Sequence, residues 1–104
     1  MIIQFNTDKT IHGTQKKQDY YSTVITDELK PYLDHITRIE VHISDENGEK
    51  GGPNDIRCLI EARLKGRQPI AFSDQANTMD LSISGAIEQL KSSLATELKG
   101  QQDS

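Results

Sequence analysis

The stretch that decides the fold is ITRIEVHISDENGEKGGPNDIRCLIEAR, residues 36–63. Apolar and polar residues alternate over 37–44 and again over 55–64, a pattern typical of β-strands with one buried face. The residues expected on the buried faces are Ile39, Val41 and Ile43 in one strand and Ile56, Cys58, Ile60 and Ala62 in the other. The segment between them, 45–54, contains Asn-Gly and Gly-Gly-Pro, which disfavour a strand interior. The stretch therefore predicts a long antiparallel hairpin.

The flanking sequence predicts one strand and one helix on each side of the hairpin. A strand is expected over 2–6, and a helix capped by Thr14 is expected over 14–34 with a kink or break at Pro31. After the hairpin, a strand is expected over 68–73. A second helix is expected to begin at Asn77, Thr78 or Asp80 and to stop at Lys99-Gly100. These elements predict a single domain over residues 1–99, with a flexible tail over 100–104.

The predicted element order is β-α-β-β-β-α. Each strand has one apolar face and each helix one apolar stripe, which favours a two-layer α+β sandwich. Both helices are then expected on one face of a four-stranded sheet, with the first strand parallel to the second and the last three strands antiparallel. The residues expected on the open sheet face are Gln4, Glu40, His42, Arg57, Glu61 and Arg63, with Leu59 as an apolar exception.

Composition narrows the class of protein. A chain of 104 residues with net charge −4 indicates one globular domain without strong nonspecific affinity for nucleic acid or anionic lipid. No apolar run approaches the roughly 18 residues that span a bilayer, and the N-terminus has no basic leader or cleavage-type site. We therefore expect a cytoplasmic protein without membrane contact. Cys58 is the single cysteine and is expected in the core.

Signals for catalysis and metal binding are weak. His12, His35 and His42 lack the paired spacing of metal ligands. The segment GEKGGP lacks the closing Gly-Lys-Ser/Thr of a phosphate loop and joins two antiparallel strands, so we interpret the loop as a solvated acidic turn. No nucleophile and base can be paired. We therefore expect no enzyme activity, no metal and no small-molecule substrate.

Nucleic-acid-binding modules require a closer comparison. The three tyrosines, Tyr20, Tyr21 and Tyr32, could stack on bases, but Tyr21 and Tyr32 belong to the apolar stripe of the first helix and are expected in the core. An RNA-recognition motif requires aromatic residues on a strand that has none here. The α-β-β-β-α core of a double-stranded-RNA-binding domain is present. However, the second helix of that domain begins with lysines, whereas this one begins with Asn-Thr-Met-Asp at 77–80.

Two segments resemble a known family. They are residues 36–63, with ITRIEVHISDENG, KGG and RCLIEAR, and residues 83–94, ISGAIEQLKSSL. They are similar to the ribosome hibernation-promoting factor and ribosome-associated inhibitor A family, also called sigma-54 modulation proteins, in its short form. The resemblance implies a cytoplasmic bacterial protein that binds the small ribosomal subunit near the messenger and transfer RNA sites. It implies inhibition of translation under stress or in stationary phase, without catalysis or a cofactor.

In that family, lysines and arginines on the helices would meet ribosomal RNA phosphates. The candidate RNA-binding residues on the helices here are Lys16, Lys17, Lys30, Lys91 and Lys99. A second set near the turn between the third and fourth strands is Arg63, Lys65 and Arg67.

The chain also departs from the family. Gln89 and Ser92 stand where relatives carry basic residues, and only Lys99 remains of a lysine cluster near the end of the helix. The alternative is a diverged protein-interaction or stress-adaptor module with weak or no ribosome binding. No oligomeric state is predicted.

Overall fold

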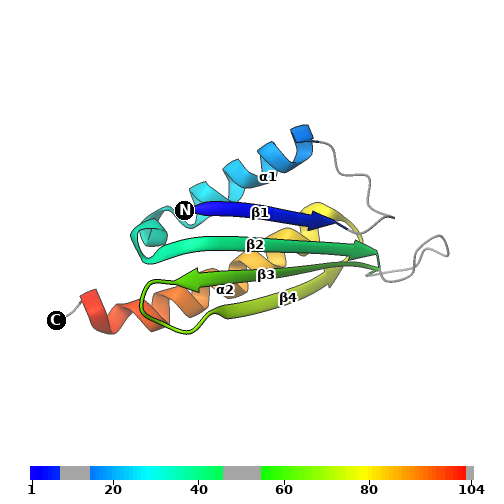
Figure 1. The fold of residues 1–104 in the computed structure, drawn as a ribbon. Helices are drawn as coiled ribbons and strands as arrows, with labels where there is room; N and C mark the ends of the chain where they lie inside the picture. Colours follow the sequence, from blue (N-terminus) through cyan, green and yellow to red (C-terminus); the bar gives the residue numbers. More distant parts are fainter. Residues whose placement is uncertain (8–14, 46–54, 103–104) are drawn as a thin grey trace.

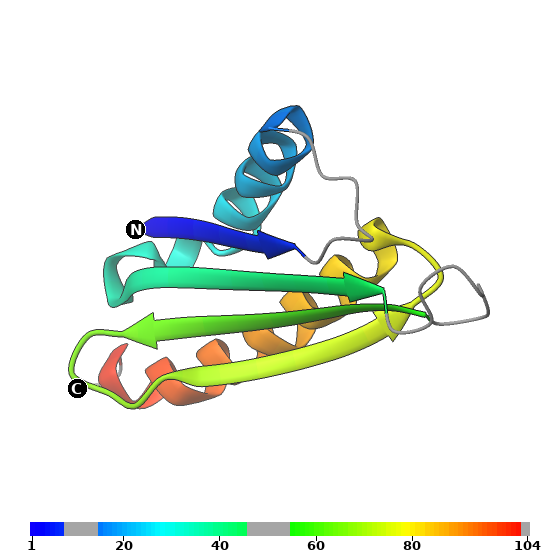
Figure 2. The same cartoon turned by 45° about the vertical axis from the view of Figure 1, so that its right-hand side comes forward.

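The computed structural model describes residues 1–7, 15–45 and 55–102, with side chains described as far as residue 98. The elements in chain order are β1 (Ile2–Thr7), α1 (Gln15–Glu28), the 3₁₀ helix η1 (Lys30–His35), β2 (Ile36–Asp45), β3 (Ile56–Leu64), β4 (Ile70–Ala76) and α2 (Met79–Gln102). The four strands form one layer, and both helices lie on the same side of it (Figures 1 and 2). The predicted α+β sandwich is confirmed.

The sheet is built on the predicted hairpin. Its order is β1-β2-β3-β4, with β1 parallel to β2 and the other neighbours antiparallel. At the centre of the hairpin, Val41 lies opposite Ile60, and both are fully buried. The loop predicted over 45–54 lies almost entirely outside the described residues; Asp45 itself ends β2.

The core fills the space between the sheet and the two helices. Its fully buried large side chains come from α1, β2, β3 and α2, and they include Ile25, Ile39, Ile60, Leu90 and Leu94. Cys58 is also buried there, and burial raises the pKa of its thiol to about 12. The core position predicted for this cysteine is confirmed.

The predicted break at Pro31 is also confirmed. The α-helix ends at Glu28, and the 3₁₀ helix has Pro31 in its first turn. Proline has no backbone N–H and disfavours helical geometry in the residue before it, so the chain leaves the α-helix at this point. The amide of Tyr32 then donates to the carbonyl of Leu29 at 2.8 Å, which begins the tighter turn. Leu29, between the two helices, is fully buried.

The ends of two elements differ from the predictions. The prediction that the second helix stops at Lys99-Gly100 is wrong, because α2 continues to Gln102. Glycine in a helix costs only about 1 kcal/mol relative to alanine, and no proline follows to end the helix sterically. Strand β4 begins after Pro69 and runs to Ala76, later than the predicted 68–73. The start of α2 agrees, since the hydroxyl of Thr78 accepts a hydrogen bond from the amide of Leu81 at 3.2 Å.

Candidate nucleic-acid interface

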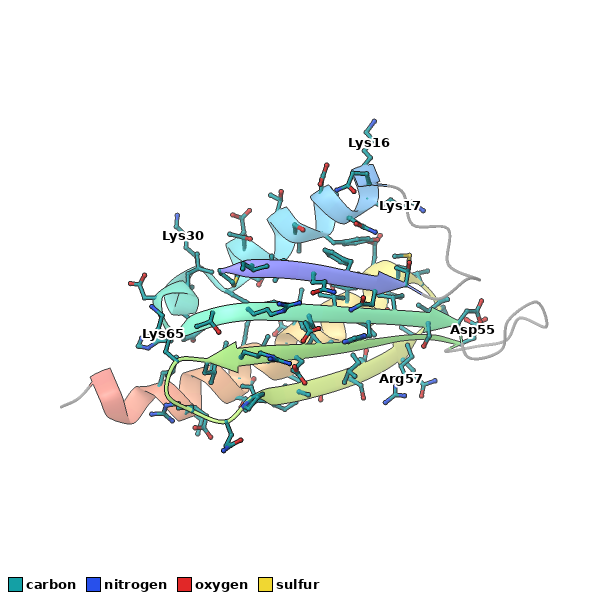
Figure 3. All side chains as sticks on the ribbon, in the orientation of Figure 1. Lys16, Lys17, Lys30, Asp55, Arg57 and Lys65 are labelled. Atoms are coloured by element: carbon teal, nitrogen blue, oxygen red, sulfur yellow. The ribbon has the colours of Figure 1, made fainter. Side chains whose placement is uncertain are left out.

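Four of the eight predicted RNA-binding residues are lysines with exposed side chains, and they lie at two ends of the molecule. Lys16 and Lys17 lie in the first turn of α1, whereas Lys30 begins η1 and Lys65 lies in the turn after β3 (Figure 3). The amide of Lys65 donates to the carbonyl of His35 at 3.0 Å, which holds that turn against the end of η1. Lys30 and Lys65 therefore belong to one end of the molecule, and Lys16 and Lys17 to the other.

Lys91 is held by acids of its own chain. Its ammonium donates to Glu28 at 2.8 Å and lies 4.0 Å from Glu88. The hydrogen bond to Glu28 is the largest cause of a raised pKa for Lys91. This bridge joins the end of α1 to the middle of α2. A phosphate at this position would compete with two carboxylates.

Arg67 is paired in a similar way. Its guanidinium donates to Glu97 at 2.8 Å, which connects the β3–β4 turn to α2. A cavity of about 620 Å³ adjoins this pair and is lined by Gly66, Arg67, Gln68, Ile70 and Glu97. Because the cavity carries one charge of each sign, it has no clear preference for an anion. The side chain of Lys99, two residues beyond Glu97, lies outside the described residues.

Arg63 belongs to a charge network on the open face of the sheet. Glu40 and Glu61 are directly opposite each other on β2 and β3. Arg63 lies between them, 3.4 Å from a Glu40 oxygen and 3.3 Å from a Glu61 oxygen. Arg38 lies 3.9 Å from Glu40, and its buried Nε finds no hydrogen-bond partner among the described residues. The Arg63 guanidinium therefore places a positive charge beside two carboxylates that face each other.

Replacing Arg63 with glutamine is expected to lower the free energy of unfolding by about 1 kcal/mol, because opposed like charges on neighbouring strands destabilise a sheet. Urea unfolding at low salt measures the change. The double variant Arg63→Gln/Glu61→Gln removes the repulsion and should recover most of the loss. An equal loss in the single and double variants would contradict this reading of the network.

The seven predicted residues whose side chains the structure describes do not converge on one patch. Three of these bases, Lys91, Arg67 and Arg63, are paired with acids of the chain. Among the described residues, no acid pairs with Lys16, Lys30 or Lys65. Since an ion pair inside the chain must be exchanged before a phosphate can bind, Lys16, Lys30 and Lys65 are the more available contacts.

A cleft between α1 and α2 was not predicted as a site. It has a volume of about 260 Å³ and is lined by Tyr20, Tyr21, Val24, Asp80, Ile83 and Ser84. Tyr21 is buried, as predicted, and its hydroxyl donates to Asp80 at 2.5 Å. Burial, and then this hydrogen bond, raise the pKa of Tyr21 above its usual range. Tyr32 is partly buried against the core, in agreement with its predicted position.

Tyr20 is the remaining tyrosine, and its side chain is 60% exposed. Its ring meets that of Tyr21 edge to face, with the ring centroids 5.2 Å apart. In the sequence, the feature that could have pointed to Tyr20 is its position beside the apolar stripe of the helix. The opposite wall of the cleft comes from α2, about sixty residues further along the chain, and could not be foreseen from spacing.

The described residues contain neither a metal-ligand cluster nor a membrane-spanning helix. In the part of the chain described here, no three His, Cys, Asp or Glu side chains gather where they could hold a metal ion. Over the same residues, neither helix combines the length and apolar character needed to cross a bilayer.

Comparison by sequence finds no matching family model and no matching curated protein. Comparison of structures finds the N-terminal domain of Protein Y from Thermus thermophilus, with TM-score 0.66 and 15% identity over 89% of this chain and 91% of that one. It also finds a ribosomal subunit interface protein from Coxiella burnetii, with TM-score 0.64 and 16% identity over 93% of this chain and 97% of that one.

At these identities the likeness concerns the fold, and it extends over nearly the full length of all three chains. The name of the Coxiella structure agrees with the resemblance carried by residues 36–63 and 83–94. The chain thus has the β-α-β-β-β-α fold of Protein Y's N-terminal domain and of a ribosomal subunit interface protein.

Proposed function

We propose that this protein is a non-enzymatic, cytoplasmic ribosome-associated factor that binds the small ribosomal subunit and inhibits translation under stress or in stationary phase. The observation that carries the proposal is the fold, shared over nearly the whole chain with a ribosomal subunit interface protein. The family resemblance of residues 36–63 and 83–94 is a property of the sequence and supports the same role.

The binding would rest on phosphate contacts from exposed bases. Lys16, Lys17, Lys30 and Lys65 have exposed side chains and form the first set. Lys91, Arg63 and Arg67 form a second set that would exchange an internal carboxylate for a phosphate. With few such contacts on a chain of net charge −4, the affinity should be modest. The affinity should also fall as the salt concentration rises. The slope of log affinity against log salt should be about −0.7 to −0.9 for each phosphate contact.

The same charges favour a second candidate function. A module that binds another protein instead of RNA would retain the fold and have no need of free bases. The ion pairs of Lys91, Arg67 and Arg63 and the net charge of −4 fit such a module. Sedimentation with ribosomes separates the two functions.

Stationary-phase extract fractionated on sucrose gradients at low salt should place the protein with the small subunit, and high salt should release it. The variant Lys30→Gln/Lys65→Gln removes two contacts at one end of the molecule. It should lower the slope of log affinity against log salt by about 1.4 to 1.8, and binding should weaken at every low salt concentration.

A charge-matched control is Thr7→Glu/Ser73→Glu. Both residues are exposed on outer strands of the sheet, and the double variant shifts the net charge by the same two units. It should bind as the unaltered protein does. Absence of the protein from ribosomal fractions at low salt would exclude the ribosomal role and leave the protein-interaction module. Equal weakening by both double variants would mean that overall charge, and not Lys30 and Lys65, sets the affinity.

A further inference from the structure

The cleft between α1 and α2 has the size of a single ring system. Its volume of about 260 Å³ lies below the roughly 300 to 1,000 Å³ of pockets that enclose a whole small molecule. Tyr20, Tyr21 and Val24 come from one helix and Asp80, Ile83 and Ser84 from the other. The walls are therefore aromatic and aliphatic, with one carboxylate and one hydroxyl.

Tyr20 presents an uncovered aromatic ring in a defined position. Its neighbour Tyr21 is 8% exposed and is fixed by the hydrogen bond to Asp80. The edge-to-face contact between the two rings, with an interplanar angle of 66°, orients Tyr20 while leaving its side chain 60% exposed. An exposed aromatic ring held in this way is a stacking platform, because every nucleobase has a π-face that can lie on it.

The charges around the platform suit a nucleotide. Lys16 is exposed and precedes Tyr20 by four residues, so the two side chains share one face of α1. Asp80 accepts the Tyr21 hydroxyl at one oxygen, and a carboxylate can accept further N–H groups. Asp19, the other acid of this part of α1, already accepts a hydrogen bond from Gln15 at 2.9 Å. A ring, a cation and a carboxylate match the base, the phosphate and the amino edge of a nucleotide.

We propose that this cleft binds one unpaired base of an RNA strand, stacked on Tyr20, with Lys16 contacting the adjacent phosphate. Asp80 would accept an N–H from the edge of the base, which favours bases with an exocyclic amino group. The proposal rests on the ribosomal role for the source of the strand, which would be ribosomal RNA. Unpaired bases are the part of RNA that proteins read by stacking.

The test uses the full chain, a labelled single-stranded RNA of about a dozen mixed nucleotides, and purified small subunits. Fluorescence anisotropy at low salt reports binding to the RNA, and sedimentation reports binding to the subunits. Replacing Tyr20 with alanine should weaken binding in both assays by about five- to a hundredfold, while Tyr20→Trp should retain it. For the single-stranded RNA, Lys16→Gln should reduce the magnitude of the slope of log affinity against log salt by about 0.7.

The matched control is Leu81→Ala. Leu81 is 57% exposed, close to the exposure of Tyr20, but it does not line the cleft. Its removal should change binding less than twofold. Circular dichroism of each variant should show that the fold is retained. If Leu81→Ala and Tyr20→Ala weaken binding by a comparable factor, general apolar contact and not stacking explains the affinity. That result would overturn the proposal.

Further outcomes separate this proposal from the ribosomal role. Subunit binding that survives Tyr20→Ala in full overturns the cleft proposal and leaves the ribosomal role intact. RNA binding that depends on Tyr20, without sedimentation on subunits, supports the cleft and overturns the ribosomal role. A protein that binds neither RNA nor subunits would overturn both the cleft proposal and the ribosomal role.

A photo-crosslinking residue at position 20 should give a crosslinked product that ribonuclease shortens. A ribonuclease-resistant product crosslinked to a protein would overturn the proposal in favour of a polypeptide partner.

Discussion

Replacing Leu90 with alanine is expected to cost about 2 to 5 kcal/mol of the free energy of unfolding. Leu90 is fully buried in the part of α2 that packs on the sheet, so its removal loses apolar burial and leaves a cavity. Small domains have only about 5 to 15 kcal/mol of stability in total, so the variant should be close to unfolding. Thermal and urea denaturation followed by circular dichroism measure the loss, and the melting temperature should fall by roughly 10 to 30 °C.

The control for this experiment lies on the same helix. Leu81→Ala removes the same atoms from a side chain that is 57% exposed, and stability should change by no more than about 0.5 kcal/mol. Both variants make the same Leu-to-Ala change within α2, and the propensity difference between leucine and alanine is small, so the difference between them reports mainly burial. A loss at Leu90 no larger than that at Leu81 would be incompatible with the packing of α2 against the sheet.

Replacing Gly85 with alanine is expected to destabilise the protein although alanine is the better helix former. A methyl group at this position would overlap the carboxylate of Asp74, with its carbon 2.5 Å from Cγ and 3.1 Å from Cβ of that residue. Overpacking of this kind costs about 1 to 3 kcal/mol, against a gain of about 1 kcal/mol in helix propensity. The net change should be a loss of up to about 2 kcal/mol in urea unfolding.

The sign of this effect should reverse when Asp74 is shortened. In the Asp74→Ala background the space beside α2 is open, so Gly85→Ala should stabilise the protein by up to about 1 kcal/mol. The four proteins form a double-mutant cycle whose coupling energy isolates the contact between β4 and α2. A Gly85→Ala effect that is identical in both backgrounds would show that the helix and the strand are further apart at this point.

Short-range patterns determined most of the fold. The alternation around Val41 and Ile60 predicted the central hairpin, because side chains of a strand point to opposite faces at every step. Pro31 predicted the end of α1, because a missing donor and a steric clash act within one turn of the chain. Gly100 predicted the end of the second helix incorrectly. The preference of glycine for helix ends is small compared with the cooperative extension of a helix that has already formed.

The candidate site was only partly accessible from the sequence. The lysines could be listed, and Lys16, Lys30 and Lys65 are exposed as a surface contact requires. The partners of the other bases could not be listed, because acids are abundant and their pairing depends on which segments meet. Lys91 and Glu28, for example, are 63 residues apart and become neighbours only when α1 packs beside α2.

The sequence by itself determined the elements, their order and the buried faces, since these depend on periodicities of two and 3.6 residues and on single breakers such as Pro31. Only the tertiary structure decided which charges remain available and where an aromatic ring stays uncovered. Tyr20 and Tyr21 are adjacent in the chain, yet one is buried against Asp80, 59 residues away from Tyr21, and the other is open to a partner. That difference arises from the approach of two helices, which no local pattern encodes.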